Sequence, residues 1–340
     1  MKSRRITIGI TGTIIFGAIL FALNLFVGSV MVPAEDILKV LLHPAEDTTL
    51  SVIIFNYRIP QILTAVLAGP ALAVAGLLMQ TLFRNPLADP SMLGISSGAG
   101  LGVGIVILLT GAVSDTAVSA FGWWSTVGVS LAAFTGAVLV LFVMLAFSSR
   151  IKNMTTLIII GLMIAYLASS VTDILKFFSL KEDIHAFVIW GMGSFSGVGA
   201  SKMPFFALSV VLGLAATVFL SKNLNILLLG EMYAENLGVN IKRNSIAVIL
   251  VSGYLTAIVT AYCGPIAFIG LAMPHIARFL FKTSDHRLLI PTTMLIGMDM
   301  ALFCNLIARM PGFDGNLPVN AITALIGAPV VIAVIMKSKK

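Results

Sequence analysis

Ionisable side chains within long apolar stretches are the first candidates for chemistry, because such groups often mark ion, proton or metal sites in a lipid environment. His275, Asp173 and Asp299 each lie within or near the end of an apolar run. No second His, Cys or carboxylate stands near His275 at a ligand spacing. Cys263 and Cys304 lie in separate apolar runs, which indicates neither a disulfide framework nor a metal site. We therefore expect no catalytic residue, no metal site and no cofactor.

One short link between two apolar runs is rich in turn-forming residues. It consists of Arg84, Asn85, Pro86, Leu87, Ala88, Asp89 and Pro90. Proline fixes φ, and Asn and Asp side chains bind nearby backbone amides, so the composition predicts a rigid turn. Taken alone, the pattern is also typical of a plain connecting turn.

A longer polar link, 221–244, predicts a short amphipathic helix bounded by Gly230 and Gly238. The apolar residues that recur at helical spacing are Leu229, Met232 or Tyr233, and Leu237. Glu231 and Glu235 occupy another face. Helices that lie on a bilayer usually carry Lys or Arg on the polar face, whereas this one carries Glu. The sequence therefore favours a protein partner over a lipid surface for this segment.

The elements that position these segments are membrane helices. Hydrophobic residues make up 59% of the 340 residues and charged residues only 10%, against roughly 25% charged in a soluble domain. Uncharged runs such as 59–83 and 245–277 meet or exceed the roughly 20 residues that cross a bilayer. The net charge of +7 resides in short basic clusters between apolar runs, which is typical of orientation signals and not of a nucleic-acid surface.

The sequence predicts an all-α polytopic membrane protein with about ten transmembrane helices in a single domain, 1–340. Eight spans are expected near 6–31, 59–83, 93–109, 121–147, 155–175, 203–220, 288–308 and 319–336. The run 245–277 is too long for one crossing and is interrupted at Gly264-Pro265 and again at Pro274, so we count it twice. Both termini are basic, which predicts that both lie in the cytoplasm and that the number of crossings is even.

Two further segments need an interpretation. The start, Met1 to Arg5 followed by apolar residues to Val32, is longer than a signal peptide, and we expect it to be the first membrane helix. The segment 184–201 is rich in Gly and Ser, and we expect an irregular or re-entrant piece at the outer side. Small residues within the second and third spans, including Gly69 and Gly98, predict close helix packing.

Together these segments resemble the FecCD-type permeases of ABC importers for iron-siderophores, haem and cobalamin. The matching residues are Arg58-Ile59-Pro60, Arg84 to Pro90 with Leu93-Gly94, Leu229-Gly230-Glu231 with Ala234 and Leu237-Gly238, Phe268 to Leu271 with Pro274-His275 and Arg278, Asp285-His286-Arg287, and Leu317-Pro318 before Gly327-Ala328-Pro329. They occur in the family's order over nearly the whole chain.

The resemblance implies a type II ABC importer permease fold with ten helices, working as a homodimer or a paired heterodimer in the bacterial cytoplasmic membrane. It also implies two separate ATP-binding subunits, an extracytoplasmic substrate-binding protein, and no catalysis by the permease itself. No nucleic-acid partner is expected. An iron(III)-siderophore is the cargo that we favour, with cobalamin or haem as the alternative.

The resemblance also implies roles for particular residues. Those of the ATPase coupling segment are Gly230, Glu231, Ala234, Leu237 and Gly238; those of the cytoplasmic gate are Asn85, Leu87, Met154 and Thr155. Arg58 and Arg309 correspond to outer-side arginines that dock the binding protein, and we expect both to reach the outer surface. The alternative is that they anchor the helix ends in the headgroup region. One difference from the family is Gln61, where many members carry a further arginine.

Two other classes of protein are weaker interpretations. An ion-coupled secondary transporter should show several intramembrane carboxylates or an inverted repeat with paired broken helices, and apart from Asp173 and Asp299 the predicted spans lack acids. An intramembrane enzyme needs a paired nucleophile and base or a metal cluster, and the sequence displays neither pattern.

Overall fold

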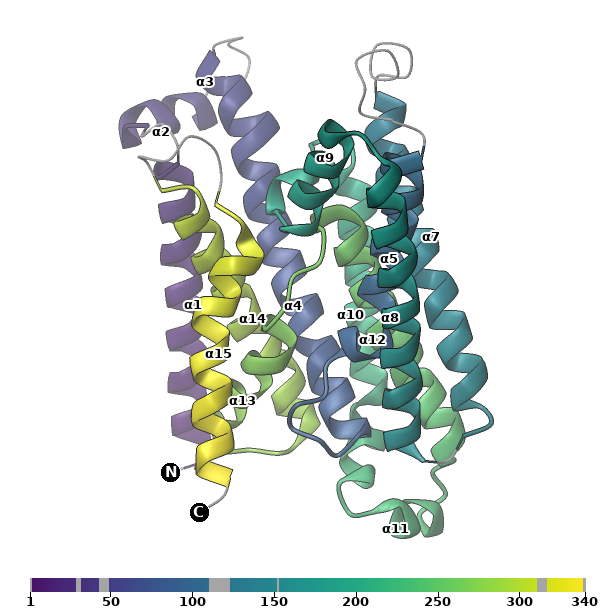
Figure 1. Cartoon of the computed structure of the whole chain (residues 1–340). Coiled ribbons are helices and arrows are strands. Elements are labelled where there is room, and N and C mark those ends of the chain that lie inside the picture. Colours follow the sequence, from purple (N-terminus) through teal and green to yellow (C-terminus); the bar gives the residue numbers. More distant parts are fainter. Residues whose placement is uncertain are drawn as a thin grey trace. The chain divides into compact units, whose positions relative to one another are not determined.

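The computed structural model describes residues 2–28, 32–42, 49–109, 123–151, 153–310 and 317–338. Every regular element in these residues is a helix (Figure 1), which confirms the predicted all-α class. The helices are α1 (Lys2–Phe26), α2 (Ala34–Leu42), α3 (Thr49–Val52), η1 (Ile53–Arg58), α4 (Ile59–Leu82), η2 (Pro90–Leu93), α5 (Ile95–Gly104), η3 (Ile105–Leu109), α7 (Trp123–Ser148), α8 (Met154–Phe178), α9 (Lys181–Gly191), η4 (Phe195–Gly197), α10 (Met203–Leu227), α11 (Glu231–Asn236), α12 (Ile241–Cys263), α13 (Ile269–Phe281), α14 (His286–Ala308) and α15 (Val319–Ser338).

Seven helical segments in the described residues are long and apolar enough to cross a membrane: Ile6–Phe26, Thr49–Leu82, Gly128–Ser148, Met154–Phe178, Met203–Leu227, Ile241–Cys263 and His286–Ala308. Three shorter apolar helices cover Ile95–Leu109, Ile269–Phe281 and Val319–Ala333. Each of these segments coincides with a predicted apolar run. The count of ten crossings stays a prediction, because three of the helices are shorter than a full span.

Several boundaries differ from the prediction. The second span begins at Thr49, since α3, η1 and α4 follow one another without a break, and Arg58 therefore lies inside the helical run. The segment after Leu180 starts with a regular helix, α9, and becomes irregular only beyond it. The run 245–277 does turn at Gly264, whose φ of 71° ends α12, but α13 continues through Pro274. The expected second interruption at Pro274 was wrong.

The chain forms two compact units by its internal contacts. The first contains Met1–Val74, Ser194–Leu214 and Ile266–Lys340, and the second contains Ala75–Gly193 and Ala215–Pro265. This division does not test the prediction of a single functional domain. The chain passes from one unit to the other within α4 and within α10, so the boundary does not separate whole helices.

A cluster of three buried amide side chains connects α1, α4 and α14 in the first unit. The Nδ2 atom of Asn305 donates to the Oδ1 atom of Asn24 at 2.9 Å, and the Nε2 atom of Gln61 donates to the Oδ1 atom of Asn305 at 3.0 Å. Asn24 itself donates to the carbonyl oxygen of Leu302 at 3.0 Å. In lipid such side-chain hydrogen bonds hold helices together, since no water competes for them.

Close backbone approach between α4 and α14 also stabilises the first unit. A Cβ atom at Gly297 would lie 2.6 Å from the carbonyl oxygen of Gly69 and 2.6 Å from the Cβ atom of Ala73. Glycine at both positions therefore lets the two helices touch along their backbones. The predicted packing role of Gly69 is confirmed.

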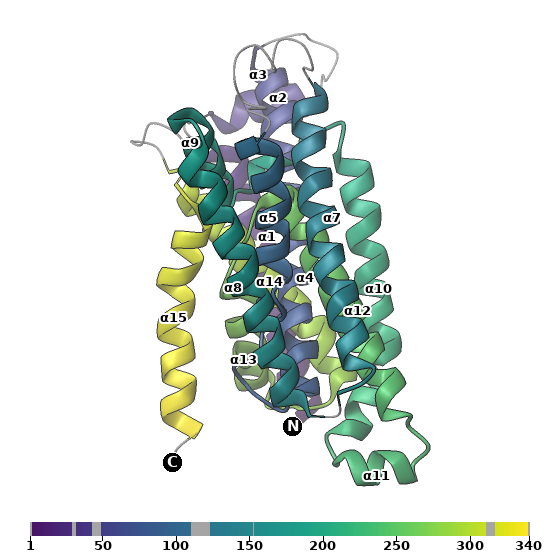
Figure 2. The ribbon, with the colours of Figure 1, turned by 45° about the vertical axis from the view of Figure 1, so that its right-hand side comes forward.

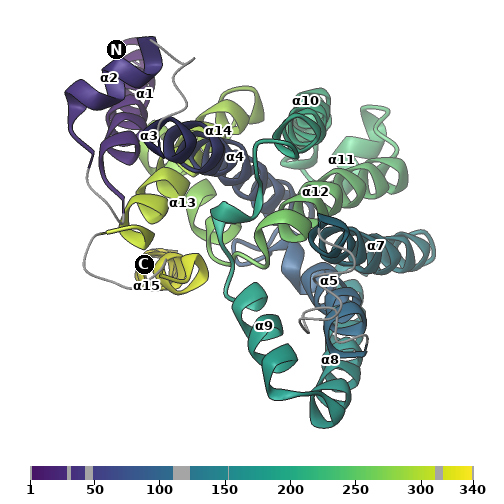
Figure 3. The same cartoon turned by 90° about the horizontal axis from the view of Figure 1, so that it is seen from above.

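In the second unit, α5 packs on α7 by the same close approach of backbones at glycine residues. A Cβ atom at Gly98 would lie 2.6 Å from the carbonyl oxygen of Gly136, and one at Gly102 would overlap the carbonyl oxygen of Ala132. Figure 3 shows α5 beside both α7 and α8. Within this unit α9 and α11 lie at opposite ends of the helices (Figure 2).

The contact between α4 and α14 provides a test of the packing. We expect Gly297→Ala to lower the free energy of unfolding by about 1–3 kcal/mol, because the added methyl group meets a backbone oxygen that cannot move away. Gly12→Ala is the control, since a Cβ atom there has nothing within 4 Å. Thermal unfolding of the detergent-solubilised protein measures both. Equal midpoints for the two variants would contradict the close contact.

Candidate functional site

The predicted amphipathic segment is a short helix, α11, between two glycines. Gly230 has a φ of 111° and Gly238 a φ of 81°, and this backbone region favours glycine. The Ala234 side chain is fully buried and anchors the helix to the second unit. The backbone amide of Val239 donates to the carbonyl oxygen of Ala234 at 2.9 Å and closes the turn after the helix. The helix and its glycine boundaries agree with the sequence prediction.

The apolar side chains of this segment point outward. Leu229, Met232, Tyr233 and Leu237 are between 60% and 73% exposed. Their helical spacing predicted one apolar face, and the structure shows that this face is not packed against the rest of the described chain. Contiguous exposed apolar residues are typical of a surface that binds another protein.

An ion pair connects α11 to the proline-rich link. The Nη2 atom of Arg84 lies 4.0 Å from the Oε1 atom of Glu231, and both side chains are at least half exposed. An exposed pair at this distance adds little stability, so its importance is positional. It shows that the link 83–90 and α11 lie at the same end of the second unit.

The proline-rich link is a rigid turn, as predicted. The Oδ1 atom of Asn85 accepts from the backbone amide of Leu87 at 2.9 Å, and the Oδ1 atom of Asp89 accepts from the amide of Ser91 at 2.9 Å. These local bonds fix the backbone between the two prolines.

The end of this link packs against α8. A Cβ atom at Gly161 would lie 2.5 Å from the carbonyl oxygen of Met92. Met154 and Thr155 form the first turn of α8, where the Oδ1 atom of Asn153 accepts from the amide of Thr155 at 2.9 Å. The predicted gate residues thus lie in the link and in the first turn of the helix on which η2 packs. Their role in gating stays a prediction.

Arg58 and Arg309, far apart in sequence, converge in the first unit. A Cβ atom at Gly28 would lie 3.0 Å from the Nη2 atom of Arg309 and 3.1 Å from that of Arg58. The Nη1 atom of Arg58 donates to the carbonyl oxygens of Leu25 and Phe26, at the end of α1. A cation at this position satisfies carbonyl groups that have no partner within the helix.

Both arginines are buried, which differs from the expectation that they reach the outer surface. Arg58 is 2% exposed and Arg309 is 6% exposed. Burial and the neighbouring Arg58 lower the pKa of Arg309 to about 10, so Arg309 stays protonated at neutral pH. Its Nη1 atom has no hydrogen-bond partner among the described residues. This end of the first unit therefore holds concentrated positive charge.

The sequence interpretation missed the role of the buried amides. Gln61 was noted only as a missing arginine, yet it is 7% exposed and belongs to the cluster with Asn24 and Asn305. An arginine at position 61 would place a charge where the Gln61 amide donates to Asn305. Asn24, Gln61 and Asn305 are polar residues within predicted spans, and this pattern could have indicated the cluster.

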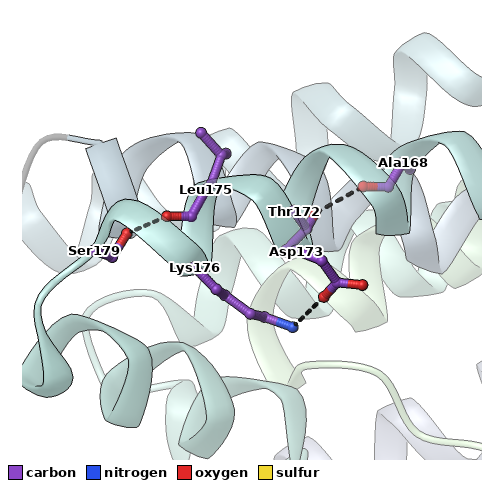
Figure 4. Close-up of polar contacts among 6 residues, drawn as sticks. All are labelled: Ala168, Thr172, Asp173, Leu175, Lys176 and Ser179. Atoms are coloured by element: carbon purple, nitrogen blue, oxygen red, sulfur yellow. Dashed lines mark hydrogen bonds and ion pairs between the residues drawn. The ribbon is translucent and has the colours of Figure 1, made fainter.

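The isolated ionisable residues take other positions. Asp173 forms an ion pair of 3.0 Å with Lys176 near the end of α8 (Figure 4), so it is not a lone carboxylate. Asp299 is buried against Gly17 of α1, with its Oδ1 atom unpartnered among the described residues. His275 is buried within α13. No group of three or more His, Cys, Asp or Glu in the described residues could hold a metal ion.

The fold and these segments define a multi-pass membrane permease. The model of the FecCD transport family matches residues 15–337, and the chain belongs to this family. It is 35% identical over 286 residues to the vitamin B12 import system permease protein BtuC of Klebsiella pneumoniae, covering 84% of this chain and 83% of that protein. BtuC of Escherichia coli O9:H4 is 32% identical over 288 residues, with 84% of each chain covered.

A solved structure supports the same assignment. A chain from an ABC transporter assigned to the metal-chelate type, in an inward-facing conformation, has a TM-score of 0.82 and 31% identity, covering 96% of this chain and 98% of that chain. The chain is therefore an ABC importer permease, a transport component without catalytic activity of its own, and it has the permease fold that the sequence predicted.

The two buried arginines should differ in their effect on stability. We expect Arg58→Gln to lower the free energy of unfolding by about 1.5–3 kcal/mol, because it removes charge-assisted hydrogen bonds to the end of α1. Arg309→Gln should be neutral or stabilising, since it removes a buried cation beside another cation. Thermal unfolding of the purified protein measures both, and a loss of similar size in Arg309→Gln would contradict this difference.

Proposed function

We propose that this chain forms the membrane pathway of an importer for a bulky metal chelate, with cobalamin as the first candidate cargo. The observation that carries the proposal is the similarity to vitamin B12 permeases over 84% of this chain. The resemblance to the family favoured an iron(III)-siderophore, because siderophore importers are the family's commonest class. On this similarity we take cobalamin as the first candidate, the siderophore as the second and haem as the third.

A second permease subunit would complete the pathway. One face of α8 packs within the second unit through Leu157, Gly161, Ala168 and Thr172, while the opposite face is apolar and exposed. Tyr166 and Leu167 are 67% and 68% exposed, and Phe177 is 83% exposed. We infer that this face meets a second copy of the chain. Asn85, Leu87, Met154 and Thr155 would then form the gate at one end of the path.

As an ABC importer permease the chain works with ATP-binding subunits, and α11 is the surface that we assign to them. The segment 230–238 offers exposed apolar side chains of the kind that protein interfaces bury. The basic ends of the chain support a cytoplasmic position for both termini, and we place α11 on that side as well.

Arg58 and Arg309 would attract the binding protein through their electrostatic potential. Two buried cations project positive potential beyond the atoms that they touch, which attracts an acidic partner and speeds its association. Arg309→Gln should therefore slow association with the cognate binding protein at low salt and flatten its salt dependence. An unchanged association rate would refute the docking role.

Uptake by the complete importer tests the cargo. We expect proteoliposomes with the permease, its ATP-binding subunits and its binding protein to accumulate radiolabelled cobalamin in an ATP-dependent manner. Labelled ferric siderophore and haem are the parallel arms. Uptake of the siderophore alone would place it first, and uptake of none of the three would overturn the proposal of a metal-chelate importer.

A charge placed on the exposed face of α11 tests the coupling surface. We expect Met232→Glu, at a side chain 73% exposed, to leave the permease folded but to weaken binding of the ATP-binding subunits by about 2 kcal/mol or more, roughly thirtyfold. Glu235→Gln is the control, because it also changes the charge of α11 by one unit but lies on the other face, the one that carries the two glutamates. Co-purification and uptake are the measurements. Normal binding in Met232→Glu, or equal losses in both variants, would refute the assignment.

A further inference from the structure

A pocket lies in the second unit between the end of α10, the segment after α11 and the start of α12, the three helices that Figure 2 shows together. Its volume is about 440 Å³, within the range of ligand sites in proteins. The residues that line it are Leu220, Lys222, Asn223, Ile226, Leu237, Gly238, Val239, Asn240, Arg243, Asn244 and Ala247. Lys222 and Arg243 are cationic, and the lining includes no carboxylate.

The start of α12 adds a second source of positive potential. This helix has 23 residues, and the Oδ1 atom of Asn240 caps it by accepting from the backbone amide of Arg243 at 2.9 Å. The N-terminus of a helix of this length carries partial positive charge and attracts anions.

Asn244 provides an independent indication of a ligand. Its side chain belongs to the pocket lining and the residue is only 4% exposed. Neither its Nδ2 atom nor its Oδ1 atom has a hydrogen-bond partner among the described residues. An unpaired buried amide is costly, so its presence in the wall of a cationic pocket indicates that a ligand supplies the missing partner.

Exposed apolar side chains of α10 lie next to this pocket. Val218 and Phe219, one turn before Lys222 on α10, are 57% and 83% exposed. Lys222 continues this exposed face, where a lysine can rest its alkyl chain on apolar surface and hold its charge at the headgroup level. Basic pockets between membrane helices are typical sites for anionic lipid headgroups.

We propose that this pocket binds a phosphate group, supplied by the headgroup of an anionic phospholipid. The cations and the helix N-terminus meet the phosphate oxygens, the Asn244 amide donates to one of them, and the acyl chains follow the apolar face of α10. The pocket shares Leu237 and Gly238 with the segment assigned to the ATP-binding subunits, so a bound lipid would stiffen the support of that surface. The proposal does not depend on which chelate the importer carries.

Native mass spectrometry of the complete importer tests the site. With phosphatidylglycerol added, we expect bound lipid in the wild type and about tenfold or greater loss of occupancy in Lys222→Gln/Arg243→Gln. Lys242→Gln is the matched control, because Lys242 adjoins Arg243 but does not line the pocket. A calorimetric titration of lipid-depleted importer with inorganic phosphate is the second arm. Phosphate binding without lipid retention identifies a free phosphate as the source and still supports the site.

Asn244→Leu separates ligand binding from structure. Replacing an unpaired amide by an apolar side chain of similar size should leave thermal stability unchanged or raise it, while lipid occupancy falls. Three results would overturn the proposal: no binding in either arm, equal loss of lipid in Lys242→Gln, or wild-type occupancy in Asn244→Leu. Each is measured without transport and is therefore distinguishable from a failure of the proposed cargo.

Discussion

The core of a bilayer offers no hydrogen-bond partners, so every polar group within a span must find one inside the protein. In the first unit this constraint determines which helices can pack together. Asn24, Gln61 and Asn305 satisfy one another and thereby tie α1, α4 and α14 into one bundle, and Gly69 and Gly297 bring α4 and α14 close enough for those bonds to form. The same constraint explains Arg58, whose guanidinium satisfies carbonyl groups at the end of α1. Arg58, which the resemblance assigned to docking at the outer surface, thus connects η1 to the end of α1.

The second unit contains all the residues assigned to the gate and to the coupling surface. Its helices α5 and α7 touch backbone to backbone at Gly98 and Gly136, and the link 83–90 is fixed by its own side chains and by Gly161 of α8. Rigid packing of this kind transmits displacement instead of absorbing it. The ion pair of Arg84 with Glu231 connects the link to α11 at the surface, while Ala234 anchors α11 from below. The link and α11 therefore lie next to each other at one end of the same compact unit.

The sequence predicted most of this architecture because lipid as a solvent leaves a strong signal. Apolar runs placed the helices within a few residues, and Gly264-Pro265 correctly divided the longest run. Two errors have physical causes. Pro274 was expected to break a helix, but α13 starts at Ile269 and continues past the proline to Phe281, so the one hydrogen bond that the proline cannot donate does not end the helix. Arg58 was treated as a boundary because a charge inside a span is costly, and its partners, the carbonyls of Leu25 and Phe26, belong to a distant helix. Contacts of this kind, like the amide cluster of Gln61, depend on tertiary packing and leave no local pattern.

The exposed face of α11 and the adjacent pocket are each unfavourable until a partner or a ligand binds, and binding at one can favour binding at the other. Leu229, Met232 and Leu237 expose apolar surface to water, which is unfavourable until a partner covers it. In the adjacent cationic pocket, the side-chain amide of Asn244 is unpaired, which is unfavourable until an anion fills the pocket. Gly238, whose φ of 81° favours glycine, follows Leu237 and also lines the pocket. Filling the pocket would restrict the segment around Gly238 and reduce the entropy lost when the apolar face binds its partner. Membrane lipid and ATP-binding subunit would then favour each other's binding, through a segment of about ten residues and without any change in the transmembrane helices.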